Sequence, residues 1–160
     1  MAGEGVSGPG IEAELKSLPF EVTTWSDWST RHPQTKVLSP ETGHSRDYQR
    51  SPYTGYFASP QLMFPVKPLD RRLALKTTVL GVRGKKSRRA YPLAAFAKIT
   101  GQEQRLDQEL DELKFTLIYD KQASSLRIEA ADDGLRWMYA FWFAWAAFHP
   151  DTEIFKQVGP

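Results

Sequence analysis

The pattern of apolar and polar positions predicts short strands that lie mainly in the second half of the chain. Runs rich in β-branched and aromatic residues, separated by turn-forming residues, predict strands at 36–39, 77–82, 89–93, 114–120 and 125–129. Residues 84–87 fit the tip of a hairpin. The segment 104–113 stays open between two states, because the spacing of its leucines fits a helix while its polar residues fit an exposed strand.

The same pattern predicts that the helices are short. Thr24 and Asp27 have the spacing of a capping box, so a helix is expected from Trp25 to about Arg31. Pro33 disfavours helical geometry at the residue before it and therefore ends this helix. Strands do not alternate with long helices, so a doubly wound sheet is not expected. The predicted class is α+β, sheet-rich and mostly antiparallel, with short helices.

One string, W-x-x-W-x-x-x-H-P-x-T, occurs twice, at 25–35 and at 142–152. It contains four of the five Trp and two of the three His, so a chance match of common residues does not explain it. The shared positions are Trp25, Trp28, His32, Pro33, Thr35, Trp142, Trp145, His149, Pro150 and Thr152. The favoured interpretation is a duplicated helix-to-strand corner. In it the Trp side chains pack in the core, the His-Pro pair ends the helix, and the Thr hydroxyl bonds to the backbone.

The paired His residues also permit a second interpretation, a transition-metal site. His32 and His149 would converge as ligands, with His44 or a Tyr as a third donor, and copper is one candidate metal. No H-x-H or H-x-x-x-H pair occurs in the sequence. The structural interpretation is therefore favoured, and no resident cofactor is expected.

A long segment, 44–72, has no periodic pattern but holds many Pro and aromatic residues. Segments of this kind are ordered loops wrapped on a core, or functional loops. The candidate ligand-binding residues of the sequence lie here: His44, Arg46, Asp47, Tyr48, Tyr53 and Tyr56. The alternative role is structural, with an Arg46–Asp47 pair and Tyr hydroxyls that tie the loop down.

Composition narrows the classes of function. The 160 residues are enough for one domain with a substantial core, and the absence of Cys excludes disulfides, thiolate metal sites and cysteine nucleophiles. The formal net charge of +2 depends on five basic residues within 83–89, at the predicted hairpin tip, so no nucleic-acid partner is expected. The sequence contains no G-x-S-x-G and no nucleotide-binding fingerprint, which favours a non-enzymatic role.

The first ten residues are Gly-rich and are expected to be disordered or frayed, followed by a single α+β domain over residues 11–160. The first ten residues have neither the basic nor the apolar region of a signal peptide, so the chain as written fits the cytoplasm. The longest apolar run, 137–148, is shorter than the roughly 20 residues that span a bilayer. No membrane span is expected.

Several segments resemble a known family. The string from Val22 to Tyr48 resembles bacterial and archaeal proteins grouped as domain of unknown function 3179. Further similar segments are 51–56, 64–66, 79–82, 90–93 and 141–150. Members of that family are usually longer, with another V-x-G-V and A-Y-P-L unit and a Cys-containing segment before the similar part. The resemblance implies that this chain corresponds to a C-terminal half and that intact members are exported or periplasmic, and it implies no reaction.

The favoured hypothesis is a non-enzymatic binding or scaffold module that docks against an N-terminal half or against another copy of itself. The first alternative is an envelope metalloprotein that uses His32 and His149. The second alternative is a carbohydrate-binding surface made by Tyr48, Tyr53, Tyr56 and a Trp, since a sugar would stack on exposed aromatic rings.

Overall fold

The computed structural model describes residues 5–13, 15–16, 18 and 20–156. They divide into two compact units. The larger unit runs up to Thr23 and again from Val66 onwards, and the smaller unit is Thr24–Pro65. The expected single domain over residues 11–160 stays a prediction, and each unit is described by itself.

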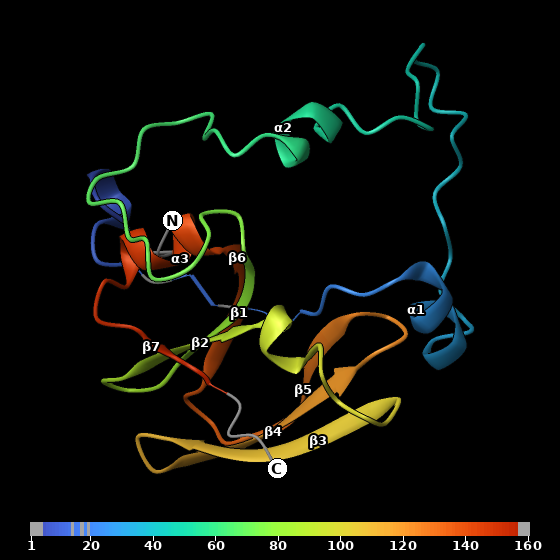
Figure 1. The fold of residues 1–160 in the computed structure, drawn as a ribbon. Coiled ribbons are helices and arrows are strands. Elements are labelled where there is room, and N and C mark those ends of the chain that lie inside the picture. The colour runs from blue at the N-terminus through green and yellow to red at the C-terminus, as the bar shows by residue number, and fades with distance from the viewer. Residues whose placement is uncertain (1–4, 14, 17, 19, 157–160) are drawn as a thin grey trace. The chain divides into compact units, whose positions relative to one another are not determined.

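The larger unit contains a four-stranded sheet in the order β6-β1-β2-β7 (Figure 1). Its strands are β1 (Thr78–Arg83), β2 (Arg88–Pro92), β6 (Arg136–Phe141) and β7 (Glu153–Ile154). Strand β1 is antiparallel to both neighbours, whereas β7 runs parallel to β2. The predicted hairpin over residues 77–93 is confirmed. Its tip is closed by a hydrogen bond of 3.0 Å from the Gly84 N–H to the Ser87 carbonyl.

A three-stranded antiparallel sheet, β3-β4-β5, makes up the second layer. Its strands are β3 (Glu103–Leu110), β4 (Leu113–Asp120) and β5 (Ser125–Ala131). The open choice at 104–113 is thus decided in favour of a strand. Exposed and half-buried positions alternate along β3, so its leucines share one face with period two. A turn at Asp111 and Glu112, both with positive φ, leads into β4.

The main core lies between the two sheets. It combines side chains from β1 and β2 with side chains from β4 and β5, and the 3-10 helix η2 (Leu93–Phe96) adds Phe96. Its fully buried members are Leu80, Val82, Tyr91, Phe96, Leu117 and Leu126. Burial of each such side chain stabilises the fold by about 1.5–3 kcal/mol, so this layer contributes most of the hydrophobic stabilisation.

The other face of the four-stranded sheet is covered by helix α3 (Trp142–Phe148). Val79 and Ala90 of the sheet pack against Trp142 and Trp145 of the helix. The contact is close at Gly81, where an added Cβ would lie 2.3 Å from ring atoms of Trp145. Glycine is needed here because any side chain would occupy the space of the indole.

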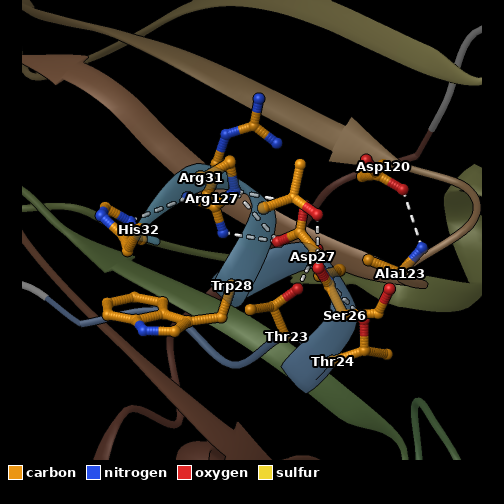
Figure 2. A network of polar contacts seen from close by, with 12 residues as sticks. Thr23, Thr24, Ser26, Asp27, Trp28, Arg31, His32, Asp120, Ala123 and Arg127 are labelled. Atoms are coloured by element: carbon orange, nitrogen blue, oxygen red, sulfur yellow. Dashed lines mark hydrogen bonds and ion pairs between the residues drawn. The ribbon is translucent and has the colours of Figure 1, made fainter. Parts of the chain in front are cut away.

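The smaller unit contains α1 (Trp25–Arg31) and α2 (Thr54–Ala58), joined by long connections. The predicted capping box and helix are confirmed, since the Thr24 hydroxyl accepts the Asp27 N–H at 3.3 Å (Figure 2). The Asp27 carboxylate also pairs with Arg31 one turn later, at 2.5 Å (Figure 2). Such i,i+4 pairs stabilise an exposed helix by a few tenths of a kcal/mol.

Two local predictions need correction or restriction. The strand expected at 36–39 is wrong: these residues pair with no strand, and Leu38 is 93% exposed. A short apolar run becomes a strand only where a neighbouring strand offers its backbone, and the smaller unit has no described strand. Of the first ten residues, 1–4 lie outside the described part, while Gly8–Gly10 form a 3-10 turn. In the described part of the chain, no helix combines the length and the apolar character needed to cross a bilayer.

Candidate functional site

The two copies of the repeated string fold into the same helix end. In each copy the His is the C-cap residue, with φ −130° and ψ 65° at His32 and φ −138° and ψ 67° at His149. The His N–H donates to the carbonyl of the second Trp, at 2.7 Å in the first copy and 2.9 Å in the second. The Thr N–H then donates to the His carbonyl, at 3.0 and 3.1 Å. The predicted role of His-Pro as the end of the helix is confirmed.

The side chains of each copy also make one common hydrogen bond. The indole N–H of Trp28 donates to the Thr35 hydroxyl at 2.9 Å, and that of Trp145 donates to the Thr152 hydroxyl at 2.9 Å. The predicted hydrogen bond from the Thr hydroxyl to the backbone is found in the second copy only. There the Thr152 hydroxyl donates to the Glu153 carbonyl at 3.3 Å. Sequence reasoning missed the Trp–Thr pair, although the equal spacing of seven residues in both copies was a visible signal.

The two imidazole rings pack on the same indoles. The ring centroids of Trp28 and His32 are 4.1 Å apart, and those of Trp145 and His149 are 4.3 Å apart. His32 belongs to the smaller unit and His149 to the larger one. Within the described residues, no group of three or more His, Asp and Glu side chains is arranged to hold a metal ion. The metal site stays a prediction from the sequence.

An arginine from a preceding loop holds the second copy in place. Arg72 donates to the carbonyls of Pro150 and Thr152, both at 2.9 Å, and its guanidinium lies 5.1 Å from the Trp142 ring centroid. A hydrogen bond with Arg72 lowers the pKa of Asp70, which orients the guanidinium from the other side. The indole N–H of Trp142 is buried and has no hydrogen-bond partner among the described residues.

Beside this second copy, the larger unit has a groove of about 640 Å³. Its apolar wall consists of Met138 and Ala140 from β6 and Ala144 and Phe148 from α3. Met138 is 39% exposed and Phe148 58% exposed, so the groove offers apolar surface to solvent. The volume lies within the range of about 300–1,000 Å³ that is usual for small-molecule sites.

Backbone register places three Arg residues side by side at one end of the four-stranded sheet. Arg83 pairs with Arg88 on β2 and with Arg136 on β6. Directly opposed residues on antiparallel strands share a face, and like charges there repel. This is the face that α3 covers, because Gly81, two residues before Arg83, contacts Trp145. Arg83 and Arg88 line the groove, and within the described part of the chain neither forms an ion pair.

The remaining titratable groups of the groove do not neutralise these arginines. Burial, and then the charges of Arg83 and Arg88, lower the pKa of His149 to about 4, so its imidazole is neutral at pH 7. The Glu153 carboxylate is bound by Arg89 at 2.8 Å. Asp151, at the exposed rim, also lines the groove. The arrangement is therefore apolar along one wall and cationic along the other.

The basic hairpin tip next to the groove is held by a carboxylate. Asp111 accepts the N–H groups of Lys86 and Ser87 at 2.6 and 2.8 Å and the Ser87 hydroxyl at 2.6 Å. These bonds, led by the Ser87 hydroxyl, lower the pKa of Asp111 to about 2. A Cβ at Gly84 would lie 2.5 Å from this carboxylate, so the Asp111 side chain would have to shift if another residue stood here. The predicted hairpin tip is confirmed, and the backbone N–H groups of Lys86 and Ser87 are occupied by Asp111.

The candidate residues predicted in the long loop are only partly brought together. Arg46, Asp47 and Tyr48 line one shallow hollow of about 610 Å³ in the smaller unit, whereas His44, Tyr53 and Tyr56 do not line it. The alternative Arg46–Asp47 ion pair does not form between these described residues, and Asp47 accepts the Gln49 N–H at 3.0 Å instead. The Tyr48 hydroxyl bonds to that of Thr42 at 2.6 Å, as a loop anchor would.

Comparison with known proteins gives one family match. Residues 1–136 match the model of a family described as "Protein of unknown function (DUF3179)". The matched region includes the first copy of the repeated string, α1, and the hairpin β1–β2, and it ends at the start of β6. No curated protein and no solved structure matches the chain significantly.

Proposed function

Because the chain belongs to this family of unknown function, we propose from its geometry that it is a non-enzymatic binding module whose small-molecule site is the groove between β6 and α3. The observation that carries the proposal is the groove itself. It has a ligand-sized volume, an apolar wall and a few polar groups along one side.

The construction of the groove supports binding to a pre-formed site. Its floor is fixed by the close contact of Gly81 with Trp145, and its end by the contacts of Arg72 with the backbone of Pro150 and Thr152. Asp111 holds Lys86 and Ser87 of the hairpin tip, which also line the groove. A site that is already ordered loses little conformational entropy when a ligand binds, which favours affinity.

The test uses an uncharged fluorescent dye, N-phenyl-1-naphthylamine, which becomes bright in an apolar site. The full chain should bind it saturably. Ala144→Phe fills the apolar wall of the groove and should weaken dye binding at least about tenfold, a change of 1.4 kcal/mol in binding free energy. The control is Ala94→Phe, at an exposed alanine of η2 outside the groove, which should bind as the original chain does. Equal loss in both variants, or no saturable binding, would contradict the proposal.

The proposal also includes docking onto a second copy of the chain. Large apolar side chains of the smaller unit are exposed: Trp25, Val37, Leu38, Tyr53, Phe57 and Phe64. Exposed apolar residues at this density are typical of surfaces that are covered in an assembly. Light scattering at increasing protein concentration should reveal a dimer that the double variant Val37→Ser, Leu38→Ser weakens and Val6→Ser does not. A monomer at every concentration would refute docking without affecting the groove.

A further inference from the structure

We propose that the ligand of the groove is an amphiphilic anion, in which a carboxylate or phosphate group is joined to an apolar body. Arg83 and Arg88 bind the oxyanion, and Met138 and Phe148 contact the apolar part. This inference rests on the proposed binding function and adds the chemical class of the ligand.

The first argument is that repulsion between aligned arginine side chains costs stability. The register aligns Arg83 with Arg88 and with Arg136 on one face of the sheet, where like charges destabilise the pairing of strands. A structural role would be met by neutral residues at these positions. An anion bound between Arg83 and Arg88 would remove the repulsion between these two guanidinium groups, neither of which forms an ion pair with another described residue.

The second argument is that the two guanidinium groups are available. Arg83 and Arg88 are half-buried and line the groove, and within the described residues they form no ion pair. Arg88 donates one hydrogen bond to the Lys86 carbonyl, which orients it and leaves its other donors open. Guanidinium groups present paired donors whose geometry matches the two oxygens of a carboxylate or phosphate.

The third argument is that the acidic groups nearby do not take the place of a ligand. The Glu153 carboxylate is held by Arg89. Asp151 is exposed at the rim and forms no ion pair with the arginines of the groove. The Asp111 carboxylate is occupied by backbone N–H groups of the hairpin tip. The groove therefore keeps an uncompensated positive charge within its own walls.

The fourth argument is the position of the apolar wall. Met138 lies two residues from Arg136 along β6, on the same face, and Ala140 continues that row. Phe148 and Ala144 face them from α3, one turn apart. Charged and apolar surfaces thus adjoin along one sheet face. A purely inorganic anion would leave the apolar half uncovered, and an uncharged apolar ligand would leave the arginines uncompensated.

The experiment measures displacement of N-phenyl-1-naphthylamine from the full chain by four ligands with eight carbon atoms each: octanoate, octyl phosphate, octanol and octylamine. Both anions should displace the dye at a concentration at least about tenfold lower than octanol, and octylammonium should be the weakest. A preference for octanoate or for octyl phosphate names the source of the oxyanion, and either supports the proposal. Inorganic phosphate alone should not displace the dye.

The matched variants separate charge from the apolar site. Arg83→Gln with Arg88→Gln should lose the preference for anions over octanol, measured as the ratio of the two displacing concentrations within that variant. Arg71→Gln, at an exposed arginine of the larger unit outside the groove, should keep that preference. The melting temperature of each variant confirms folding, and removal of the like charges should not lower it.

The outcomes distinguish the two levels of the proposal. If octanol displaces the dye as well as octanoate does, or if the double Arg variant keeps the preference for anions, the ligand class is wrong while the groove remains a binding site. If inorganic phosphate displaces the dye as effectively as octyl phosphate, the apolar body is wrong. If the dye itself does not bind saturably, the proposed function fails, and this inference fails with it.

Discussion

The two copies of the repeated corner share a backbone and a side-chain hydrogen bond, yet they lie in different surroundings. In the second copy Trp142 and Trp145 are 0% and 2% exposed, whereas in the first Trp25 is 56% exposed and Trp28 is half-buried. The second copy packs on a sheet that offers Gly81 as a space for the indole. The first copy belongs to a unit without described strands.

The difference shows that the local sequence determines the backbone of the corner, whereas the presence of a neighbouring sheet determines how far its Trp side chains are buried. Equal φ and ψ values at His32 and His149, and equal Trp–Thr bonds of 2.9 Å, appear with and without a covering sheet. The contribution of the corner to stability must differ, because buried apolar surface and buried hydrogen bonds dominate the energy of packing. Three pairs of variants and one single variant at His149 test this contrast.

The largest contrast is expected for the second Trp of each copy. Trp145→Ala removes a buried indole and should lower the free energy of unfolding by about 3–5 kcal/mol. Trp28→Ala removes a half-buried indole, and the loss should be about 1 kcal/mol. Urea denaturation of both variants measures the difference, and equal losses would contradict a locally encoded corner that only one sheet covers.

The next contrast concerns the space for the indole. Gly81→Ala introduces a methyl group 2.3 Å from the Trp145 ring, and the forced shift of helix against sheet should cost at least about 1–3 kcal/mol. Gly55→Ala, where a methyl group meets nothing within 4 Å, should be neutral or stabilise α2 by up to about 1 kcal/mol. Thermal melting separates the two, and an unchanged melting temperature for Gly81→Ala would show that the close approach is not needed.

A smaller contrast is expected for the Trp–Thr hydrogen bond. Thr152→Val leaves the Trp145 N–H without its partner in a buried site, which should cost about 1–3 kcal/mol. Thr35→Val leaves the Trp28 N–H open to water and should cost at most about 0.5 kcal/mol. If both substitutions reduce the unfolding free energy equally, the surroundings do not set the value of this bond.

The smallest contrast depends on pH and involves His149. Because its folded pKa lies near 4 and its unfolded value near 6.5, the neutral ring is favoured by folding. The contribution of His149 to the free energy of unfolding is fully present above pH 6.5 and is lost as the pH falls towards 4. We expect a loss of about 1 kcal/mol, because solvent screens this partly buried ring. His149→Gln should flatten the stability curve in that range. A separate loss between pH 3.8 and 2 is expected from Asp111 and should persist in this variant.

Much of the fold follows from local pattern. The β-branched and aromatic runs of the hairpin and of β4 and β5 predict their strands, and the capping box predicts the start of α1 at Trp25. The strand expected at 36–39 fails because an apolar run needs a partner strand, which no local pattern reports. The choice between helix and strand at 104–113 likewise depends on pairing with β4.

The groove was not predictable from the sequence, because it depends on register and on contacts between distant segments. The sequence places the basic residues 83–89 at a hairpin tip, and only the pairing of Arg83 with Arg88 and Arg136 shows that part of the cluster lies on one face beside α3. The role of Asp111 depends on a contact across 25 residues of sequence. The Trp–Thr spacing was visible in the repeat, but the geometry of the helix end was needed to connect the two side chains.

The paired indole hydrogen bonds have a consequence for the time scale of motion. Both have the same length, so bond length does not distinguish the two Trp protons. Exchange of the Trp28 proton with solvent requires only fraying of an exposed corner, whereas exchange of the Trp145 proton requires α3 to separate from the sheet. In deuterated water the two signals decay at rates set by these separate openings, and their ratio reports how much more often an uncovered corner opens than a covered one.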